Sequence, residues 1–299
     1  MQQHDDVHEL AAAVALLRGA RVAALTGAGV STESGIPDYR GPEASKRVRR
    51  PIQGPEFVRS ADLRRRYWAR AMVGWDRFRS ALPGASHHAL ADLEAAGIVR
   101  GLVTQNVDRL HHVAGSQDIV ELHGALAEVI CLACGAMEER DAVQERMDRL
   151  NPGWLASLAT AQAVAPGTEA TPMAPDGDAD LTGERIARFV VPGCLGCGGT
   201  LKPNVVFFGH NVAKPVVDAA FAAVDAADAL LIAGTSLAVF SGYRFLLRAA
   251  ERKIPIVVVN RGAVRGEERV TLKLEMGTGA ALAGLARELG AHRPVRATA

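Results

Sequence analysis

Short apolar runs, each followed by small or polar residues, recur along this chain. The runs that predict strands are residues 22–25, 98–104, 119–122, 205–208, 229–233 and 256–260. Between several of them apolar residues recur with helical spacing, as in 87–96 and 215–227. Buried strands that alternate with helices predict an open, mostly parallel α/β sheet covered on both faces. We therefore expect a Rossmann-like, doubly wound sheet.

Four of the predicted strands end in groups that could bind a ligand. These strand ends are Thr26-Gly27, Thr104-Gln105-Asn106, Gly234-Thr235-Ser236 and Asn260-Arg261-Gly262. In doubly wound folds, ligands bind just beyond the carboxyl ends of the strands. The pattern therefore predicts a binding site along one edge of the sheet.

Two stretches interrupt the alternation and predict a smaller domain. Residues 42–84 are rich in arginine and aromatic residues and are expected to form a helical insertion. Residues 126–200 hold all four cysteines, and their Pro- and Gly-rich part at 151–183 predicts a long loop. The Rossmann-like domain is then assigned to residues 1–41, 85–125 and 201–292.

Composition narrows the class of protein further. The chain has 299 residues, 48% of them hydrophobic, and a net charge of +1, so it can bury a full core and has no basic field for nucleic acid or an anionic membrane. No apolar run approaches the roughly 20 residues that span a bilayer, and the N-terminus lacks secretory or transit character. We expect a cytoplasmic bacterial protein, or a mitochondrial matrix protein if a leader was removed.

The cysteines form two C-x-x-C pairs, Cys131/Cys134 and Cys194/Cys197. Two such pairs in a reducing compartment favour a tetrahedral metal site over disulfides, and a thioredoxin-like redox pair would explain only one of them. Four thiolates leave no open coordination position. The spacing therefore predicts a structural zinc ion.

His123 follows the predicted strand 119–122 and would share the sheet edge with Gln105, Asn106 and Asp108. A histidine in this place can act as a general base near neutral pH, although a lone histidine at a strand end is often a structural hydrogen-bonding group. No serine-based triad is evident. Catalysis is expected to use the electrophilicity of a cofactor.

The loop after the first strand, GAGVSTESGIPDYRG at 27–41, departs from the dinucleotide-binding fingerprint because Thr32 occupies the place of its third glycine. This departure disfavours a plain dehydrogenase. A zinc-ribbon module that binds nucleic acid is also disfavoured, because only 5% of residues are aromatic and the net charge is near zero.

Taken together, the motifs resemble those of the sirtuins, which are NAD-dependent protein deacylases. The resemblance covers roughly residues 8–285 and rests on motifs in the order of that family: GAGVSTESGIPDYRG, TQNVDRLH, ELHG, the two C-x-x-C pairs, LKPNVVFFG, GTS and VVVNRG. RRPIQGPEFVRS, RRRYWAR, VGW, APDGD and SGYRFLL are similar to class II sirtuins of the mitochondrial sirtuin-four type.

The resemblance implies which residues bind NAD. Glycines at the first strand end would admit the pyrophosphate, and a mobile loop would fold over the nicotinamide ribose. The implied NAD-binding residues are Gly27, Ala28, Gly29, Ile36, Pro37, Asp38, Tyr39, Arg40, Gln105, Asn106, Val107, Asp108, Gly234, Thr235, Ser236, Asn260, Arg261, Gly262 and Thr278.

The resemblance also implies the reaction. The acyl-lysine oxygen attacks the nicotinamide ribose and expels nicotinamide, after which His123 serves as the base for a ribose hydroxyl, with Asn106 as a second catalytic residue. Acylated-lysine proteins or peptides are the expected partners of a monomer that binds no nucleic acid and no membrane. Mono-ADP-ribosyl transfer in the same NAD site stays an alternative, whereas the intact set of Gln105, Asn106, Asp108 and His123 argues against a mere NAD sensor.

The resemblance also indicates residues that would bind the acylated substrate. By resemblance, Val205, Phe207, Phe208 and Gly209 grip the acyl peptide. The pair Tyr67 and Arg70 has the Tyr-x-x-Arg spacing of sirtuins that favour acidic acyl groups, although the same pair would also suit an ordinary helix face.

Three basic residues also bear on the substrate. His210 occupies a position where the family often has Glu or Asp, and we hypothesise that it reduces repulsion of acidic acyl groups or peptides. Arg49 and Arg50 could bind a carboxylated acyl chain, but a solvated charge run is the favoured interpretation.

Overall fold

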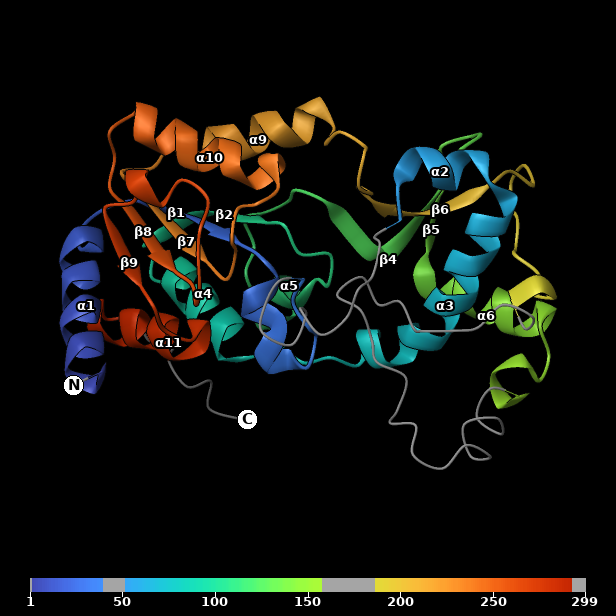
Figure 1. Ribbon diagram of the computed structural model, residues 1–299, viewed down its shortest axis with the longest axis horizontal. Helices are drawn as coiled ribbons and strands as arrows, with labels where there is room; N and C mark the ends of the chain where they lie inside the picture. The colour runs from blue at the N-terminus through green and yellow to red at the C-terminus, as the bar shows by residue number, and fades with distance from the viewer. Residues whose placement is uncertain (1, 40–51, 158–185, 292–299) are drawn as a thin grey trace. The chain divides into compact units, whose positions relative to one another are not determined.

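The computed structural model describes residues 2–39, 52–157 and 186–291 (Figure 1). The chain divides into two compact units. The first comprises Met1–Arg47, Leu82–His123 and Val212–Ala299, and the second comprises Val48–Ala81 and Gly124–Asn211. Within the described residues, no helix is both long and apolar enough to cross a membrane.

The first unit contains a six-stranded parallel sheet in the order β3-β2-β1-β7-β8-β9. Its strands are β1 (Val22–Thr26), β2 (Val99–Thr104), β3 (Ile119–Glu121), β7 (Ala229–Ala233), β8 (Ile256–Val259) and β9 (Leu272–Leu274). The chain winds outward from β1 in one direction and from β7 in the other. The order of strands therefore reverses between β1 and β7, which is where ligands bind in such sheets.

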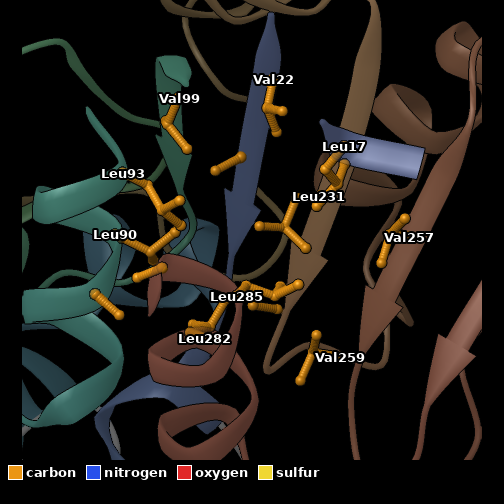
Figure 2. Packing of buried hydrophobic residues seen from close by; sticks show 14 of the residues in the cluster. Leu17, Val22, Leu90, Leu93, Val99, Leu231, Val257, Val259, Leu282 and Leu285 are labelled. Carbon is orange, nitrogen blue, oxygen red and sulfur yellow. The ribbon is translucent and has the colours of Figure 1, made fainter. Parts of the chain in front are cut away.

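Helices cover both faces of this sheet, because alternate residues of β1 and β7 face opposite sides. On one face lie α1 (Gln2–Leu17), α4 (Ala85–Ala95) and α11 (Thr278–Glu288), and on the other lie α9 (Lys214–Asp225) and α10 (Phe240–Glu251) (Figure 1). Figure 2 shows Leu282 and Leu285 of α11 beside Leu231 of β7 in the first of these layers. The unit also holds α5 (Leu110–Ala114) and the short helices η1 (Ala28–Ser34) and η3 (Glu267–Arg269). The predicted Rossmann-like sheet is confirmed.

The second unit is a three-stranded antiparallel sheet with its own apolar core. The sheet has the order β5-β4-β6, formed by β5 (Met137–Glu139), β4 (Gly124–Cys131) and β6 (Leu201–Val205). Helices α2 (Gly54–Arg59), α3 (Ala61–Arg79) and α6 (Arg140–Leu150) accompany it. Trp68, Phe57 and Met147 are fully buried in this core.

Two details of the sequence interpretation are wrong. The strand expected at 205–208 lies instead at Leu201–Val205, and it pairs with β4 rather than with the parallel sheet. Residues 201–211 consequently group with the second unit instead of the Rossmann-like domain. The apolar run 205–208 suggests the strand, whereas Lys202 and Pro203 interrupt the pattern of the actual strand. Lys202 is nevertheless only 8% exposed, and its ammonium donates to the carbonyl oxygen of Pro203 at 2.9 Å.

Candidate active site and metal centre

Glycines after β1 and β7 allow two loops to pack backbone against backbone. The amide of Gly29 donates to the carbonyl of Gly234 at 2.8 Å, and the amide of Gly27 donates to that of Ala233 at 3.1 Å. A Cβ atom on Gly27 or Gly29 would lie 2.6–2.7 Å from Thr235 or Gly234, respectively, which real Cβ atoms do not tolerate. The glycines thus allow the two loops to approach closely at the reversal of strand order, which is where ligands bind in such sheets.

Replacing Gly234 with alanine is expected to destabilise the fold by about 2 kcal/mol and to weaken NAD binding at least tenfold. Gly234 has φ +64°, and its added Cβ would lie 2.5 Å from the backbone nitrogen of Val30. Thermal denaturation and calorimetric NAD titration measure the two effects. Gly19→Ala is the control, since Gly19 has φ +75° but no atom within 4 Å of the added Cβ. Equal losses in the two variants would show that the loop packing is unimportant.

Polar side chains from three segments meet beyond the ends of β1 and β2. Asn106 donates through Nδ2 to the carbonyl of Gly27 at 3.1 Å and to Oγ of Ser31 at 3.0 Å. The Ser31 hydroxyl donates in turn to Oδ2 of Asp108 at 2.7 Å, while Oδ1 of Asp108 accepts from the amide of Leu110. The network fixes the orientation of Asn106 and Asp108.

His87 extends this network from the start of α4. Its Nδ1 accepts from the amide of Gly84 at 3.1 Å, so the proton of the neutral ring is on Nε2, which lies 3.4 Å from Oγ of Ser31. Burial lowers the pKa of His87, although the charge of Asp108 opposes this effect. His111 packs against His87, and burial, with smaller contributions from neighbouring histidines, lowers its pKa to about 3. Both imidazoles are therefore neutral at pH 7.

His123 follows β3 and is held at both ring nitrogens. Its Nδ1 lies 2.8 Å from the carbonyl oxygen of Gln105, and its Nε2 lies 2.9 Å from Oγ of Ser241 on α10. A carbonyl only accepts, so Nδ1 carries the proton and Nε2 carries the lone pair. Burial lowers the pKa of His123, partly offset by the hydrogen bond to Gln105. The imidazole is consequently neutral at pH 7 and is equipped to accept a proton.

Gln105 links His123 to the loop after β7. Its side-chain Nε2 donates to the carbonyl of Thr26 and to Oγ1 of Thr235, both at 3.1 Å. On the same loop, the carbonyl of Ser236 accepts from the amide of Arg265 at 2.9 Å. The strand ends of β1, β2 and β7 are thereby joined by hydrogen bonds.

The residues expected to bind the adenosine half of NAD lie after the carboxyl end of β8 and at the start of α11. Asn260 is 9% exposed and donates through Nδ2 to the carbonyl of Arg261 at 3.0 Å and to that of Gly262 at 3.3 Å. Thr278 donates to the carbonyl of Gly29 at 3.3 Å. They belong to the same unit as the glycine loops, as the sequence predicts.

The four cysteine sulfurs of the second unit lie close together. All four Sγ atoms lie within 4.8 Å of one another, with Cys131 to Cys197 at 3.6 Å and Cys134 to Cys194 at 3.7 Å. These distances exceed a disulfide bond of about 2.05 Å. The distances within the two named pairs are close to the roughly 3.8 Å edge of a tetrahedron with zinc–sulfur bonds of about 2.3 Å. The residues therefore fit the structural zinc that the spacing predicts.

The two halves of the metal site have the same backbone geometry. The amide of Gly135 donates to the carbonyl of Cys131 at 2.9 Å, and the amide of Gly198 donates to that of Cys194 at 2.8 Å. Both glycines have positive φ, near +75° and +69°, which tight turns around a metal require. Each C-x-x-C-G segment is thus a preformed zinc knuckle.

The expected substrate residues lie in the second unit. Tyr67 is 2% exposed and packs edge-on against Phe57, with Trp68 and Phe207 as further ring neighbours. Phe208 pairs with Gln53 in an isolated parallel bridge, and its carbonyl accepts from Gly54 at 2.8 Å. Tyr67 is therefore a core aromatic in this structure, which supports the helix-face interpretation of the Tyr-x-x-Arg spacing.

His210 lies directly against Gly54, whose added Cβ would come within 2.5 Å of the imidazole. Burial and the nearby ammonium of Lys202 lower the pKa of His210. Burial likewise lowers the pKa of Lys202 to about 8. A neutral imidazole, rather than a carboxylate, thus follows Gly209 at pH 7.

Some sequence predictions lie outside the described residues, namely Arg40, Arg49, Arg50 and most of the loop 151–183. Conversely, the sequence pattern does not indicate three residues that the structure places in the site, namely Ser31, His87 and Ser241. Ser31 lies within the glycine motif, which could have drawn attention to it. His87 and Ser241 open helices, where both residue types are common, so only the tertiary structure reveals their partners.

Comparison with known proteins identifies relatives of similar length. Residues 27–241 match the family model described as Sir2 family. NAD-dependent protein deacetylase 1 of Mycobacterium avium is 48% identical over 92% of this chain and 94% of its own length. The mitochondrial NAD-dependent protein lipoamidase sirtuin-4 of Bos taurus is 50% identical over 85% of this chain and 78% of its own length. A solved structure described as Sir2 with p53 peptide and NAD+ is 26% identical, with a TM-score of 0.71 over 92% of this chain and 96% of that one.

Proposed function

The chain belongs to the Sir2 family and is an NAD-dependent protein deacylase, and on that premise we propose that it removes bulky acyl groups from lysine side chains with His123 as general base. The observation that carries the catalytic assignment is the geometry of His123. Its protonated Nδ1 is fixed by the carbonyl of Gln105, which leaves the lone pair on Nε2.

NAD supplies an electrophilic ribose carbon from which nicotinamide departs, and it is consumed in the reaction. The side chains of the site bind and orient this co-substrate in the proposal. We propose that Asn106 and Asp108, each fixed by Ser31, orient the nicotinamide ribose. The glycines after β1 and β7 would receive the pyrophosphate, and Ser236, Asn260 and Thr278 the adenosine half.

His123 would act in the proton transfer that follows the departure of nicotinamide. When a ribose hydroxyl attacks the acyl carbon, it loses a proton, and Nε2 of His123 accepts it. The depressed pKa of His123 keeps this nitrogen unprotonated at pH 7, so no prior deprotonation is required. His87, also neutral, would donate through Nε2 to Ser31 and preserve the orientation of Asp108.

The preference for a bulky acyl group rests on two observations. The cattle relative, 50% identical, is a lipoamidase by name. In this chain Tyr67 is 2% exposed, packed in an aromatic cluster with Phe207, so it is not placed to bind an acidic acyl chain directly. A neutral His210 beside Gly209 is compatible with acyl peptides of either charge.

A panel of acyl-lysine peptides tests this proposal. Nicotinamide release and deacylated product are measured with acetyl, succinyl, methylglutaryl, lipoyl and long-chain acyl peptides. We expect kcat/KM to be at least tenfold higher for the lipoyl or long-chain peptide than for the acetyl peptide, about 1.4 kcal/mol of extra transition-state binding. A preference for succinyl or methylglutaryl peptides would instead show that the enzyme favours acidic acyl groups. Labelled ADP-ribose on protein without deacylation would establish mono-ADP-ribosyl transfer.

A further inference from the structure

A serine hydroxyl is hydrogen-bonded to Nε2 of His123, the ring nitrogen through which this residue would act as a base. Ser241 is the second residue of α10, and its Oγ lies 2.9 Å from Nε2 of His123. Because Nδ1 holds the proton of the neutral ring, Nε2 accepts here and the Ser241 hydroxyl donates. His123 is thus gripped between the carbonyl of Gln105 and the hydroxyl of Ser241.

The residue after Ser241 contributes to the same arrangement. Gly242 is buried, and a Cβ atom on it would come within 2.5 Å of Oε1 of Gln105. The space left by Gly242 admits the Gln105 side chain, which bonds to Thr26 and Thr235. Two consecutive residues of α10 therefore support both His123 and the residue that holds its Nδ1 proton.

We propose that Ser241 is a positioning residue of the deacylation step, which holds Nε2 of His123 before the reaction and stabilises the imidazolium that forms during it. This inference rests on the proposed role of His123 as general base. A hydroxyl suits both states, because it donates to neutral Nε2 and then, by rotation about its C–O bond, turns its proton away. The rotation frees the lone pair of Nε2 for the proton of the ribose hydroxyl and turns a lone pair of Ser241 toward the Nε2–H that results. Alanine could do neither.

The direction of the effect follows from the strengths of the two hydrogen bonds. A hydrogen bond from the imidazolium to Ser241 is charge-assisted and stronger than the bond that the hydroxyl makes to the neutral ring. Ser241 therefore favours the protonated form in a site where burial disfavours it. Its removal is expected to lower the pKa of His123 further and to make it a weaker base.

Charged groups on the elements around His123 have partners of their own. Glu121 on β3 is paired with Arg109 at 3.3 Å and lies 3.4 Å from His112. Asp108 is bonded to Ser31, and the guanidinium of Arg244 on α10 lies over the ring of Phe240. Burial lowers the pKa of His123, and the hydrogen bond to the Gln105 carbonyl raises it. Ser241 carries no charge, so its replacement leaves the charge of the site unchanged.

The first test measures the titration of His123 in the protein without NAD. Histidine-selective NMR follows its imidazole signals against pH, with His123→Asn identifying them, in wild type, Ser241→Ala and Ser241→Thr. We expect a lower midpoint in Ser241→Ala and a midpoint near that of wild type in Ser241→Thr, which keeps the hydroxyl. A midpoint that Ser241→Ala leaves unchanged would overturn the proposal, whatever acyl group the enzyme prefers.

The second test separates the two steps of the reaction. In Ser241→Ala, formation of deacylated product is expected to fall about tenfold, while exchange of labelled nicotinamide into NAD, which reports the earlier step, changes less than about twofold. The acid limb of the pH profile should move to lower pH, and Ser241→Thr should restore product formation. Three outcomes would contradict a positioning role. Ser241→Ala could slow nicotinamide exchange as much as product formation, Ser241→Thr could lose as much product formation as Ser241→Ala, or Ser241→Ala could form product faster than wild type. Absence of product from wild type with every acyl peptide would instead contradict the proposed function.

Discussion

Replacing His123 with alanine is expected to lower the rate of deacylation by about 10²–10⁴-fold, the usual contribution of a positioned general base. The variant loses the Nε2 lone pair and both hydrogen bonds that fix the ring, to Gln105 and Ser241. It retains the loops after β1 and β7. NAD affinity, measured by calorimetry, should therefore stay within about threefold of wild type while product formation, measured by mass spectrometry, falls.

The pH profile of the wild type provides an independent check on His123. A base must be unprotonated to act, and burial lowers the pKa of His123 below its ordinary value of 6.5. The acid limb of kcat/KM should consequently lie below pH 6.5, with activity constant from there to neutral pH. A limb above pH 6.5 would mean that another group limits the rate.

His8→Ala is the matched control, because His8 is exposed on α1. It should have wild-type kinetics. If His123→Ala retains more than about a tenth of the wild-type product formation, a different base operates, a result incompatible with the expected 10²-fold minimum.

Loss of the zinc site is expected to unfold the second unit. Binding of structural zinc contributes about 10–16 kcal/mol in small zinc modules, which is comparable to the whole stability of a typical domain. Cys131→Ser or prolonged treatment with a chelator should therefore abolish zinc content, measured by mass spectrometry, and expose α3 and β4 to proteolysis. Deacylation should be lost as well, because β6, which leads into the proposed peptide-gripping residues, begins directly after the second knuckle.

The same variant should keep its affinity for NAD, because the first unit has its own two-layered core. Leu195→Ser is the matched control for Cys131→Ser: Leu195 lies within a C-x-x-C segment, is 76% exposed and ligates nothing in the proposed site. We expect it to retain one zinc per chain and full protease resistance. A Cys131→Ser protein that is equally resistant would show that the sheet and helices fold without the metal.

Much of the first unit could be predicted from the sequence, because its strands are buried on both faces. Runs such as those of β1, β7 and β8 are apolar at almost every position, and a run of this kind has few alternatives to a central parallel strand. β9 has only three residues, with Lys273 in the middle, so its apolar pattern is too short to predict.

The second unit was harder to predict because its strands carry mixed patterns. In β6, Lys202 and Pro203 interrupt the apolar run, and only the tertiary structure shows that the ammonium lies over the ring of Phe207 and bonds to backbone carbonyls. The zinc knuckles were the exception. Their ligand spacing is fixed by local geometry and can be read without knowledge of the fold.

Some site residues could likewise be predicted from the sequence, and others could not. Gln105, Asn106 and His123 follow strands directly, so the parallel topology alone predicts a common edge. Ser241 lies more than a hundred residues from His123 in sequence, and nothing in its local pattern distinguishes it from an ordinary serine at the start of a helix. Contacts of that kind depend on how α10 packs on the sheet, which a single sequence does not specify.

The central place of β1 has a consequence for synthesis of the chain on the ribosome. β1 is made among the first residues, yet one of its two neighbours, β7, begins only at Ala229. Until then β1 has an open apolar edge, the kind of surface that invites wrong pairing in a nascent chain. The second unit has all of its strands by Val205 and can complete its core earlier. Chaperones that shield emerging chains are therefore expected to matter most for the half of the protein that binds NAD.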